Sequence, residues 1–282
     1  MTDEPTVPTP LPDLTMNDGH TIPAIGFGTW KMPAEQTIAS VHTALAAGYR
    51  HIDTAALYAN ETEVGQAINH NPHASRDQVF VTTKIWNDRQ GREESRAAFE
   101  ESAAKLDVGV IDLLLIHWPV PSQDLYVDTW KTLIDLREEG RVRSIGVSNF
   151  QPWHIERLIE ETGVVPAVNQ IELHPFLPQT EAREFHDAHG IVTEAWSPLH
   201  QGTRLLLDSR VKDVAARNNM SPAQAVLVWH LSKGVIPLPK SVTPARVAEN
   251  YQAIALTLPP EDLAALDAMA DGLRRGMNPD EM

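Results

Sequence analysis

Residues 112–148 read DLLLIHWPVPSQDLYVDTWKTLIDLREEGRVRSIGVS, and this stretch decides the fold. It starts with an apolar segment of strand length (112–117), continues with apolar residues at helical spacing (129–140), and ends with a second strand-like segment (143–148). A continuously apolar strand is typical of a parallel sheet that is covered on both faces. The stretch therefore predicts one strand–helix–strand unit of a parallel α/β protein.

The same unit recurs along the chain. Eight segments have strand character: 24–29, 50–53, 79–84, 112–117, 143–148, 167–172, 192–196 and 235–240. Helical patterns alternate with them or follow them at 37–48, 93–106, 129–140, 153–162, 181–190, 221–231, 245–254 and 259–270. Eight strands alternating with helices in a chain of 282 residues predict an α/β fold, the (β/α)8 TIM barrel.

The two ends of the chain add to this prediction. Residues 14–23, LTMNDGHTIP, are expected to form a β-hairpin that closes the barrel bottom, with Asn17, Asp18 and Gly19 as its turn. The proline-rich residues 1–12 are expected to be a flexible leader, and residues 13–282 a single barrel domain.

A doubly wound nucleotide-binding sheet is the alternative fold. Such a sheet normally carries G-x-G-x-x-G after its first strand. The nearest match here, Gly26-Phe27-Gly28, lacks the third glycine and does not begin a helix. The barrel is therefore favoured.

Composition excludes several classes of site. Lys and Arg number 23 against 38 Asp and Glu, which gives a net charge of −15, and there is no cysteine. A disulfide framework, a thiolate zinc site, an iron–sulfur cluster and a cysteine nucleophile are thus excluded. The acidic balance also argues against a nucleic-acid surface. Because we find no signal peptide and no apolar run long enough to span a membrane, we expect a cytoplasmic protein without a membrane partner.

Four ionisable side chains lie at or just after predicted strand ends. Asp53, Lys84 and His117 end three successive strands, and Tyr58 follows Asp53 closely. Alone, each has an ordinary structural explanation: a helix N-cap, a solvated strand end, a core histidine or a packing aromatic. Because active sites of such barrels lie at the carboxyl ends of the strands, all four are expected to converge on one site.

Together these residues predict a proton donor. The side chain of a tyrosine has a pKa of about 10 and is therefore a poor acid at neutral pH. A nearby Lys84 ammonium is expected to favour the phenolate and so lower the pKa of Tyr58. Asp53 would hold Lys84, and His117 would donate a hydrogen bond to a substrate carbonyl. The chain has no redox group of its own, so hydride would have to come from a bound cofactor.

Two other classes of function are weighed against this one. A metal-dependent hydrolase would need several ligands at strand ends, and only His51 and Asp53 come near that pattern. Two further histidine pairs with i, i+3 spacing, His70/His73 and His186/His189, are interpreted as surface residues, so no metal is expected. A barrel that binds a nucleotide without catalysis is the second alternative.

Five blocks of sequence resemble the aldo-keto reductase family, in the family's order: GYRHIDTAALYANETEVG, LLLIHWP, RSIGVSNF, AVNQIELHP and LPKSVTPARVAEN. The chain is similar in particular to the bacterial branch that includes 2,5-diketo-D-gluconate reductases. The resemblance implies a monomeric NADPH-dependent reductase of small carbonyl compounds. Its catalytic residues would be Tyr58 as the acid, with Asp53, Lys84 and His117.

The resemblance also implies a set of cofactor residues. Lys240, Ser241 and Arg246 would surround the 2′-phosphate of NADPH, next to Asn250 at the adenine, and Val242 would belong to the same cofactor site. Ser148, Asn149 and Gln170 would hold the nicotinamide carboxamide, although they could equally serve only to satisfy the barrel rim. Trp196 would stack on the nicotinamide. The remaining positions are Gly28, Thr29, Trp30, Asp53, Ser197, Leu199, Gln201 and Gly202.

The substrate would meet tryptophan walls. Trp30, Trp86 and Trp118, with Tyr58 and His117, are expected to surround the carbonyl. Three other tryptophans on helical patterns, Trp130, Trp153 and Trp229, are expected to pack in the core.

One position departs from the family. His200 stands where the branch commonly has glycine, and its ring would crowd the loop near the cofactor diphosphate. Arg204 is hypothesised to reach that diphosphate.

Overall fold

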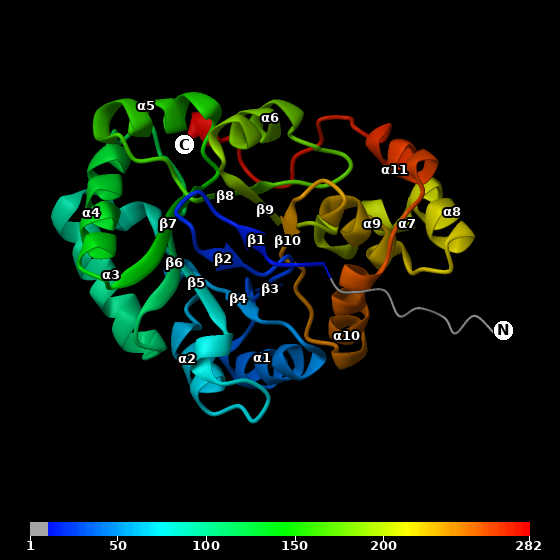
Figure 1. Ribbon diagram of the computed structural model, residues 1–282, viewed down its shortest axis with the longest axis horizontal. Helices are drawn as coiled ribbons and strands as arrows, with labels where there is room; N and C mark the ends of the chain where they lie inside the picture. The colour runs from blue at the N-terminus through cyan, green and yellow to red at the C-terminus, as the bar shows by residue number, and fades with distance from the viewer. Residues whose placement is uncertain (1–10) are drawn as a thin grey trace.

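Eight parallel strands form the centre of the computed structural model, which describes residues 11–282 (Figure 1). Each strand pairs with its neighbour in the chain, in the order β10-β9-β8-β7-β6-β5-β4-β3. Their bounds are β3 (Phe27–Gly28), β4 (His51–Asp53), β5 (Phe80–Ile85), β6 (Ile111–Ile116), β7 (Val142–Ser148), β8 (Val168–Glu172), β9 (Val192–Trp196) and β10 (Ile236–Pro237). All eight predicted strand segments are confirmed.

Backbone hydrogen bonds join the first strand to the last. The amides of Gly26 and Gly28 donate to the carbonyls of Pro237 and Pro239, each at 3.1 Å. Glycine suits this position, because a Cβ on Gly26 would lie 2.4 Å from the Leu238 side chain and 2.7 Å from the buried His51 ring. The sheet therefore closes, and the (β/α)8 barrel is confirmed.

Helices surround the sheet (Figure 1). Those that the sequence predicts are α1 (Ala34–Ala47), α3 (Arg92–Leu106), α4 (Tyr126–Glu138), α5 (Pro152–Thr162), α6 (Thr180–His189), α9 (Pro222–Leu231), α10 (Pro244–Gln252) and α11 (Pro260–Asp267). Capping residues fix several ends. Gly48 ends α1 with a φ of +112°, and the Ser221 hydroxyl accepts the Gln224 amide at the start of α9.

Three further helices are present that the sequence did not predict. They are α2 (Glu61–Asn69), α7 (Arg204–Leu207) and α8 (Ser209–Arg217). The middle of α2 holds Gly65, where a Cβ would lie 1.9 Å from the Leu106 carbonyl oxygen at the end of α3. A glycine that is unfavourable for an isolated helix is thus needed for the packing of α2 against α3.

The N-terminal hairpin closes the barrel bottom, as expected. Its strands, β1 (Leu14–Thr15) and β2 (Thr21–Ile22), pair antiparallel around a turn where Gly19 has a φ of +87°. Met16 and Ile22 pack against the barrel residues Leu113 and Leu115. Of the predicted leader, residues 1–10 lie outside the described part of the chain, so that division of the chain stays a prediction.

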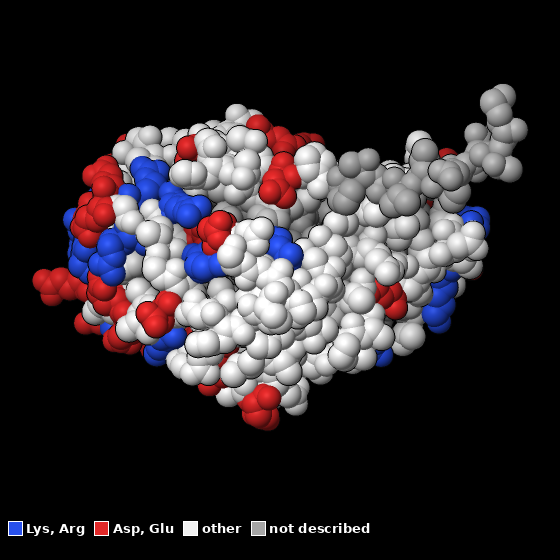
Figure 2. All heavy atoms as spheres, turned by 60° about the horizontal axis from the view of Figure 1, so that its bottom comes forward, with Lys and Arg blue, Asp and Glu red and all other residues white. Residues whose placement is uncertain are grey.

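Charges of both signs alternate on the α3–α4 side of the molecule, at the left of Figure 2. Arg96 pairs with Glu139 at 2.7 Å, and Arg141 with Glu100 at 2.8 Å. The cations of this side are therefore neutralised locally despite the net charge of −15. In residues 11–282 no helix has both the length and the apolar character needed to cross a membrane.

Candidate active site

A cavity of about 850 Å³ opens at the carboxyl ends of the strands. Most predicted site residues line it: Gly28, Trp30, Asp53, Tyr58, Trp86, His117, Trp118, Asn149, Gln170, Trp196, Ser197, Leu199, Gln201, Gly202, Lys240, Ser241, Arg246 and Asn250. Four do not: Thr29, Lys84, Ser148 and Val242. Three of these are fully buried behind the wall, and Val242 is exposed at the surface.

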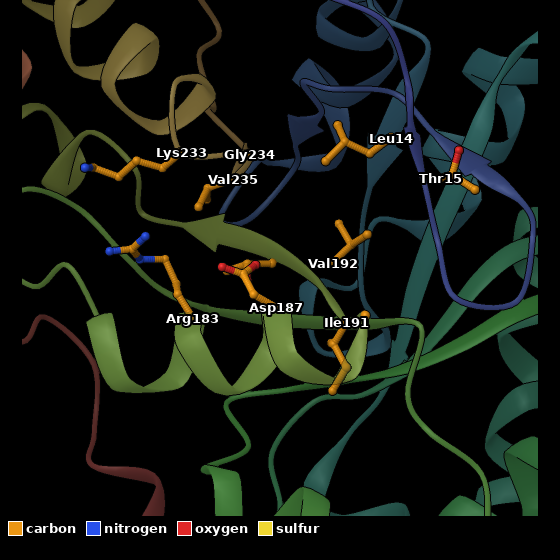
Figure 3. A pocket seen from close by; sticks show the side chains of 11 residues that line it. Leu14, Thr15, Arg183, Asp187, Ile191, Val192, Lys233, Gly234 and Val235 are labelled. Carbon is orange, nitrogen blue, oxygen red and sulfur yellow. The ribbon is translucent and has the colours of Figure 1, made fainter. Parts of the chain in front are cut away.

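A smaller cavity of about 300 Å³ lies at the opposite, hairpin end of the barrel (Figure 3). Its two cationic side chains already have partners, since Lys233 pairs with Asp267 at 2.7 Å and Arg183 donates to the Pro178 carbonyl. No predicted site residue lines it. The larger cavity is therefore the candidate active site.

A buried ion pair lies at the base of the cavity. The Lys84 ammonium is inaccessible to solvent and donates to Asp53 Oδ2 at 2.6 Å and to the Thr54 carbonyl at 2.9 Å. Thr29 donates in turn to the Asp53 carbonyl. The expectation that Asp53 holds Lys84 agrees with this geometry, because a charge-assisted bond of this length fixes the ammonium.

Tyr58 lies above this pair on a 3₁₀ turn, η1 (Ala56–Tyr58). The Lys84 Nζ atom is 5.3 Å from the centre of its ring, and the His117 ring centre is 5.8 Å away. Burial, helped by the Asp53 carboxylate, raises the pKa of Tyr58 well above its usual range. The expected net lowering of this pKa is therefore wrong for the structure without a ligand, because burial, the largest contribution, outweighs the effect of the Lys84 charge. Tyr58 is thus a protonated phenol.

His117 follows β6 and faces the same space. Its ring meets Trp86 edge to face, with the centres 4.9 Å apart. Burial and the nearby Lys84 charge lower the pKa of His117 well below its usual range. The imidazole is therefore neutral, and it can donate one hydrogen bond and accept another.

Asn149 organises the next part of the wall. It has a left-handed backbone, with a φ of +62°, and its amide donates to the His117 carbonyl and the Ser148 hydroxyl. Its Oδ1 accepts the Trp196 indole N–H at 2.7 Å. The Ser148 hydroxyl donates to the Gln170 carbonyl. This chain of hydrogen bonds fixes the Trp196 ring at the end of β9.

Glu194 is a buried residue that the sequence analysis missed. The Gln170 amide nitrogen donates to Asp53 Oδ2 at 2.9 Å and to Glu194 Oε2 at 2.8 Å. The other Glu194 oxygen lies 3.7 Å from His51 Nε2. Burial, followed by the Asp53 charge, raises the pKa of Glu194 to about 8. Gln170 thus links the Asp53 carboxyl group, which is the partner of Lys84, to a protonated Glu194.

Cations without carboxylate partners lie elsewhere along the cavity. Lys240 and Arg246 both line it, near Ser241 and Asn250. In residues 11–282 neither cation is in an ion pair with a carboxylate, whereas most arginines of the surface are. Two unneutralised cations beside a hydroxyl and an amide are suited to bind an anionic group.

The loop after β9 differs from expectation. The His200 ring is buried against His174 and Phe176, with ring centres 4.9 and 5.5 Å apart, and so does not crowd the cavity. Arg204 points to Asp271, 3.3 Å away, and does not line the cavity. Arg275 from the C-terminal segment lines the cavity instead, and no local pattern around Arg275 predicts this position.

Two structural assignments made from helical patterns are wrong. Trp130 and Trp229 are buried as expected, but Trp153 is 47% exposed and donates to Asp280 at 3.1 Å. His186 is fully buried between Asn169 and Thr193 and is no surface residue. In the described chain, residues 11–282, no group of three or more ligating side chains could hold a metal ion.

The chain resembles known reductases over nearly its full length. An aldo-keto reductase of Mycolicibacterium smegmatis is 51% identical over 268 residues, which cover 95% of this chain and 97% of the relative. Methylglyoxal reductase DkgA of Salmonella typhimurium is 46% identical over 269 residues, with coverages of 95% and 97%.

Solved structures of related proteins have the same fold as this chain. The apo form of Gox0644 superposes with a TM-score of 0.90 at 48% identity, covering 95% of this chain and 97% of that one. A Gox0644 mutant in complex with NADPH has a TM-score of 0.91 at 46% identity, with coverages of 96% and 98%. The model of the "Aldo/keto reductase family" matches residues 24–271. With about half of the residues identical along the chain, the same fold and a family model that matches residues 24–271, this protein belongs to the aldo/keto reductase family.

Proposed function

We propose that the protein is an NADPH-dependent carbonyl reductase, an alcohol:NADP+ oxidoreductase that reduces aldehydes, α-dicarbonyls or keto-sugars. The observation that carries the proposal is one cavity that joins a protonated Tyr58 and a neutral His117 to Lys240 and Arg246, two cations that form no ion pair within the described residues 11–282. The related Gox0644 mutant was solved with NADPH, and methylglyoxal reductases are 46% identical to this chain.

The residues present fit NADPH. Lys240, Ser241 and Arg246 would hold its 2′-phosphate, because a dianion is best matched by a guanidinium fork and an ammonium. Asn250 would meet the adenine, and the Asn149–Trp196 wall would hold the nicotinamide. When bound, the cofactor supplies the hydride that the side chains of this chain cannot supply.

The protein's own part is to bind, orient and protonate the carbonyl. His117 would donate a hydrogen bond to the carbonyl oxygen, and Tyr58 would give it the phenolic proton as charge develops there. Lys84, fixed by Asp53 at 2.6 Å, places a positive charge 5.3 Å from the Tyr58 ring, where it stabilises the phenolate left behind.

Tryptophans make the substrate end of the cavity apolar. Trp30, Trp86 and Trp118 line it, and the centre of the Trp118 ring is 6.4 Å from that of Trp196. Excluding water strengthens the hydrogen bonds that Tyr58 and His117 make to a small carbonyl. On the family resemblance, we propose that the protein acts as a monomer, and in the cytoplasm.

The direct test is consumption of NADPH with a panel of carbonyl compounds. We expect turnover with methylglyoxal, a nitrobenzaldehyde and a ketose, with NADPH preferred over NADH. An enzyme that binds NADPH but reduces none of the panel would be a binding protein instead. Tightly bound zinc, measured on the same preparation, would contradict the reductase mechanism.

Neutralising Lys240 or Arg246 is expected to weaken NADPH binding about tenfold or more, because each loses a charge-assisted bond to the phosphate. NADH binding should change little, and the loss should shrink at high salt. Titration of the intrinsic tryptophan fluorescence gives both dissociation constants. Arg204→Ala is the matched control, since this arginine faces Asp271, outside the cavity. An equal loss of affinity for NADPH and NADH would argue against a site for the 2′-phosphate.

A further inference from the structure

The C-terminal segment, residues 272–282, forms part of the cavity wall. Arg275, Gly276 and Met277 line the cavity, and further along the Met282 carbonyl accepts the Ser122 amide at 3.3 Å. These contacts join the end of the chain to the rim of the barrel. Residues 275–277 are therefore placed by the barrel and not by local structure of their own.

A buried carboxylate holds this wall. Glu172 ends β8, is 1% exposed, and accepts the backbone amides of Arg275 at 2.5 Å and Gly276 at 2.9 Å. The ring of His174 forms a third hydrogen bond to it at 3.0 Å. Burial alone would raise the pKa of Glu172, but the bonds from His174 and the two amides hold that pKa below its usual range. Glu172 is therefore ionised.

Gly276 allows the C-terminal segment to pack closely against the barrel. A Cβ at this position would lie 2.5 Å from Cη2 of Trp196, so only glycine lets the backbone pack directly on the indole. Trp196 is itself fixed by Asn149. In the β8–β9 register Glu172 pairs with Trp196, so the carboxylate and the indole reach the same short stretch of backbone.

Arg275 turns its side chain along the cavity wall. Its guanidinium donates to the Gln201 side chain at 2.8 Å. Across the described residues 11–282 it forms no ion pair with a carboxylate, whereas Arg204 nearby does. A cation on a cavity wall that holds only a neutral partner retains donors for an anionic group of a ligand.

We propose that Glu172 is a positioning residue that holds residues 275–277 against Trp196 and thereby directs the Arg275 guanidinium to an anionic group of the bound ligand. The anion is either the cofactor diphosphate or a carboxylate on the substrate. This inference rests on the proposed reductase function for its ligand, but the hold of Glu172 on the segment does not need turnover.

Limited proteolysis tests the hold directly. Trypsin cuts after Arg274 and Arg275, next to the two amides that Glu172 binds, and cleavage requires local opening. Glu172→Gln should be cut there about tenfold faster than wild type, because it loses a charge-assisted acceptor. Trp153→Phe, which removes the bond to Asp280 and keeps an aromatic ring beside His154, should be cut at the wild-type rate at these bonds. Equal protection of wild type and Glu172→Gln would overturn the proposal.

Binding and kinetics test the role of Arg275. Glu172→Gln and Arg275→Met should raise the same constant, either the NADPH dissociation constant or the KM of the carbonyl substrate, about five- to tenfold. The double variant should raise it no further than the single variants do, because both substitutions act through the Arg275 guanidinium. A rise in the NADPH dissociation constant identifies the cofactor diphosphate as the anion that Arg275 binds. A rise in KM that is seen only for carbonyl compounds with a carboxylate identifies the substrate carboxylate as that anion. If Arg275→Met changes neither constant, or Glu172→Gln lowers only thermal stability, the proposal is wrong.

These measurements separate two failures. A wild type without turnover would contradict the proposed function, whereas proteolysis and NADPH binding would still decide whether Glu172 positions the segment. An active wild type in which Glu172→Gln keeps both constants would leave the reductase intact and reject the inference.

Discussion

Replacing Tyr58 with phenylalanine is expected to lower the rate of carbonyl reduction by about 10²–10⁴-fold, the usual contribution of a general acid. The substitution removes only the hydroxyl and keeps the ring beside His117, with centres 5.8 Å apart. Since the phenol is protonated in this structure, the lost group is the proton donor itself. Steady-state kinetics with methylglyoxal and NADPH measure the effect, which should fall on kcat.

Binding of the cofactor separates this loss from damage to the cavity. The NADPH dissociation constant of Tyr58→Phe should stay within about twofold of wild type, because the proposed phosphate site at Lys240 and Arg246 is unchanged. Tyr126→Phe is the matched control: it removes the hydroxyl of another tyrosine, on α4, whose partner is Arg157. If Tyr58→Phe reduces carbonyls as fast as this control does, another group is the acid.

Local sequence was enough to predict most of the barrel. The apolar strand segments and the capping residues Gly48 and Ser221 act within a few positions of the elements that they define. Helix α2 was missed because Gly65 is unfavourable by helix propensity, and the reason for it is the Leu106 carbonyl, which lies on another helix. Packing against a distant backbone leaves no local pattern.

The same limit applies to the site. The residues at strand ends converge because parallel strands all end at one rim, so Asp53, Lys84 and His117 could be predicted together. Trp153 and Arg275 could not be placed, since their partners, Asp280 and Gln201, are far away in the sequence. Helical periodicity shows which residues share a face, but not which segment later covers it.

Glu194→Gln is expected to remove a pH dependence of stability that wild type shows between about pH 4.5 and 8. Burial, followed by the Asp53 charge, raises the pKa of Glu194 from 4.5 to about 8 in the folded protein. In that window the folded state holds a proton that the unfolded chain has lost. The contribution of Glu194 to the free energy of unfolding is therefore greatest below pH 4.5. It falls by about 1.4 kcal/mol per pH unit as the pH rises towards 8.

Glutamine mimics the protonated acid because it is neutral and keeps an oxygen to accept the Gln170 amide, which lies 2.8 Å from the carboxyl in wild type. The difference in unfolding free energy between variant and wild type should therefore move in favour of the variant by about 1.4 kcal/mol per pH unit. Urea unfolding at pH 5, 6, 7 and 8 measures it. Asp53, Lys84 and His51 also face Glu194 and are common to both proteins, so the difference reports the proton held by Glu194 together with the coupling of Glu194 to these neighbours.

Glu160→Gln, which removes an exposed carboxylate on α5, controls for the change in net charge. A difference between Glu194→Gln and wild type that stays constant from pH 5 to 8 would mean that Glu194 is already ionised beside Asp53. Gln170 would then bridge two anions, and Lys84 would have to neutralise both. If the slope is observed, Glu194 is protonated beside Asp53, and the Lys84 ammonium keeps Asp53 as its hydrogen-bonded partner beneath the Tyr58 ring.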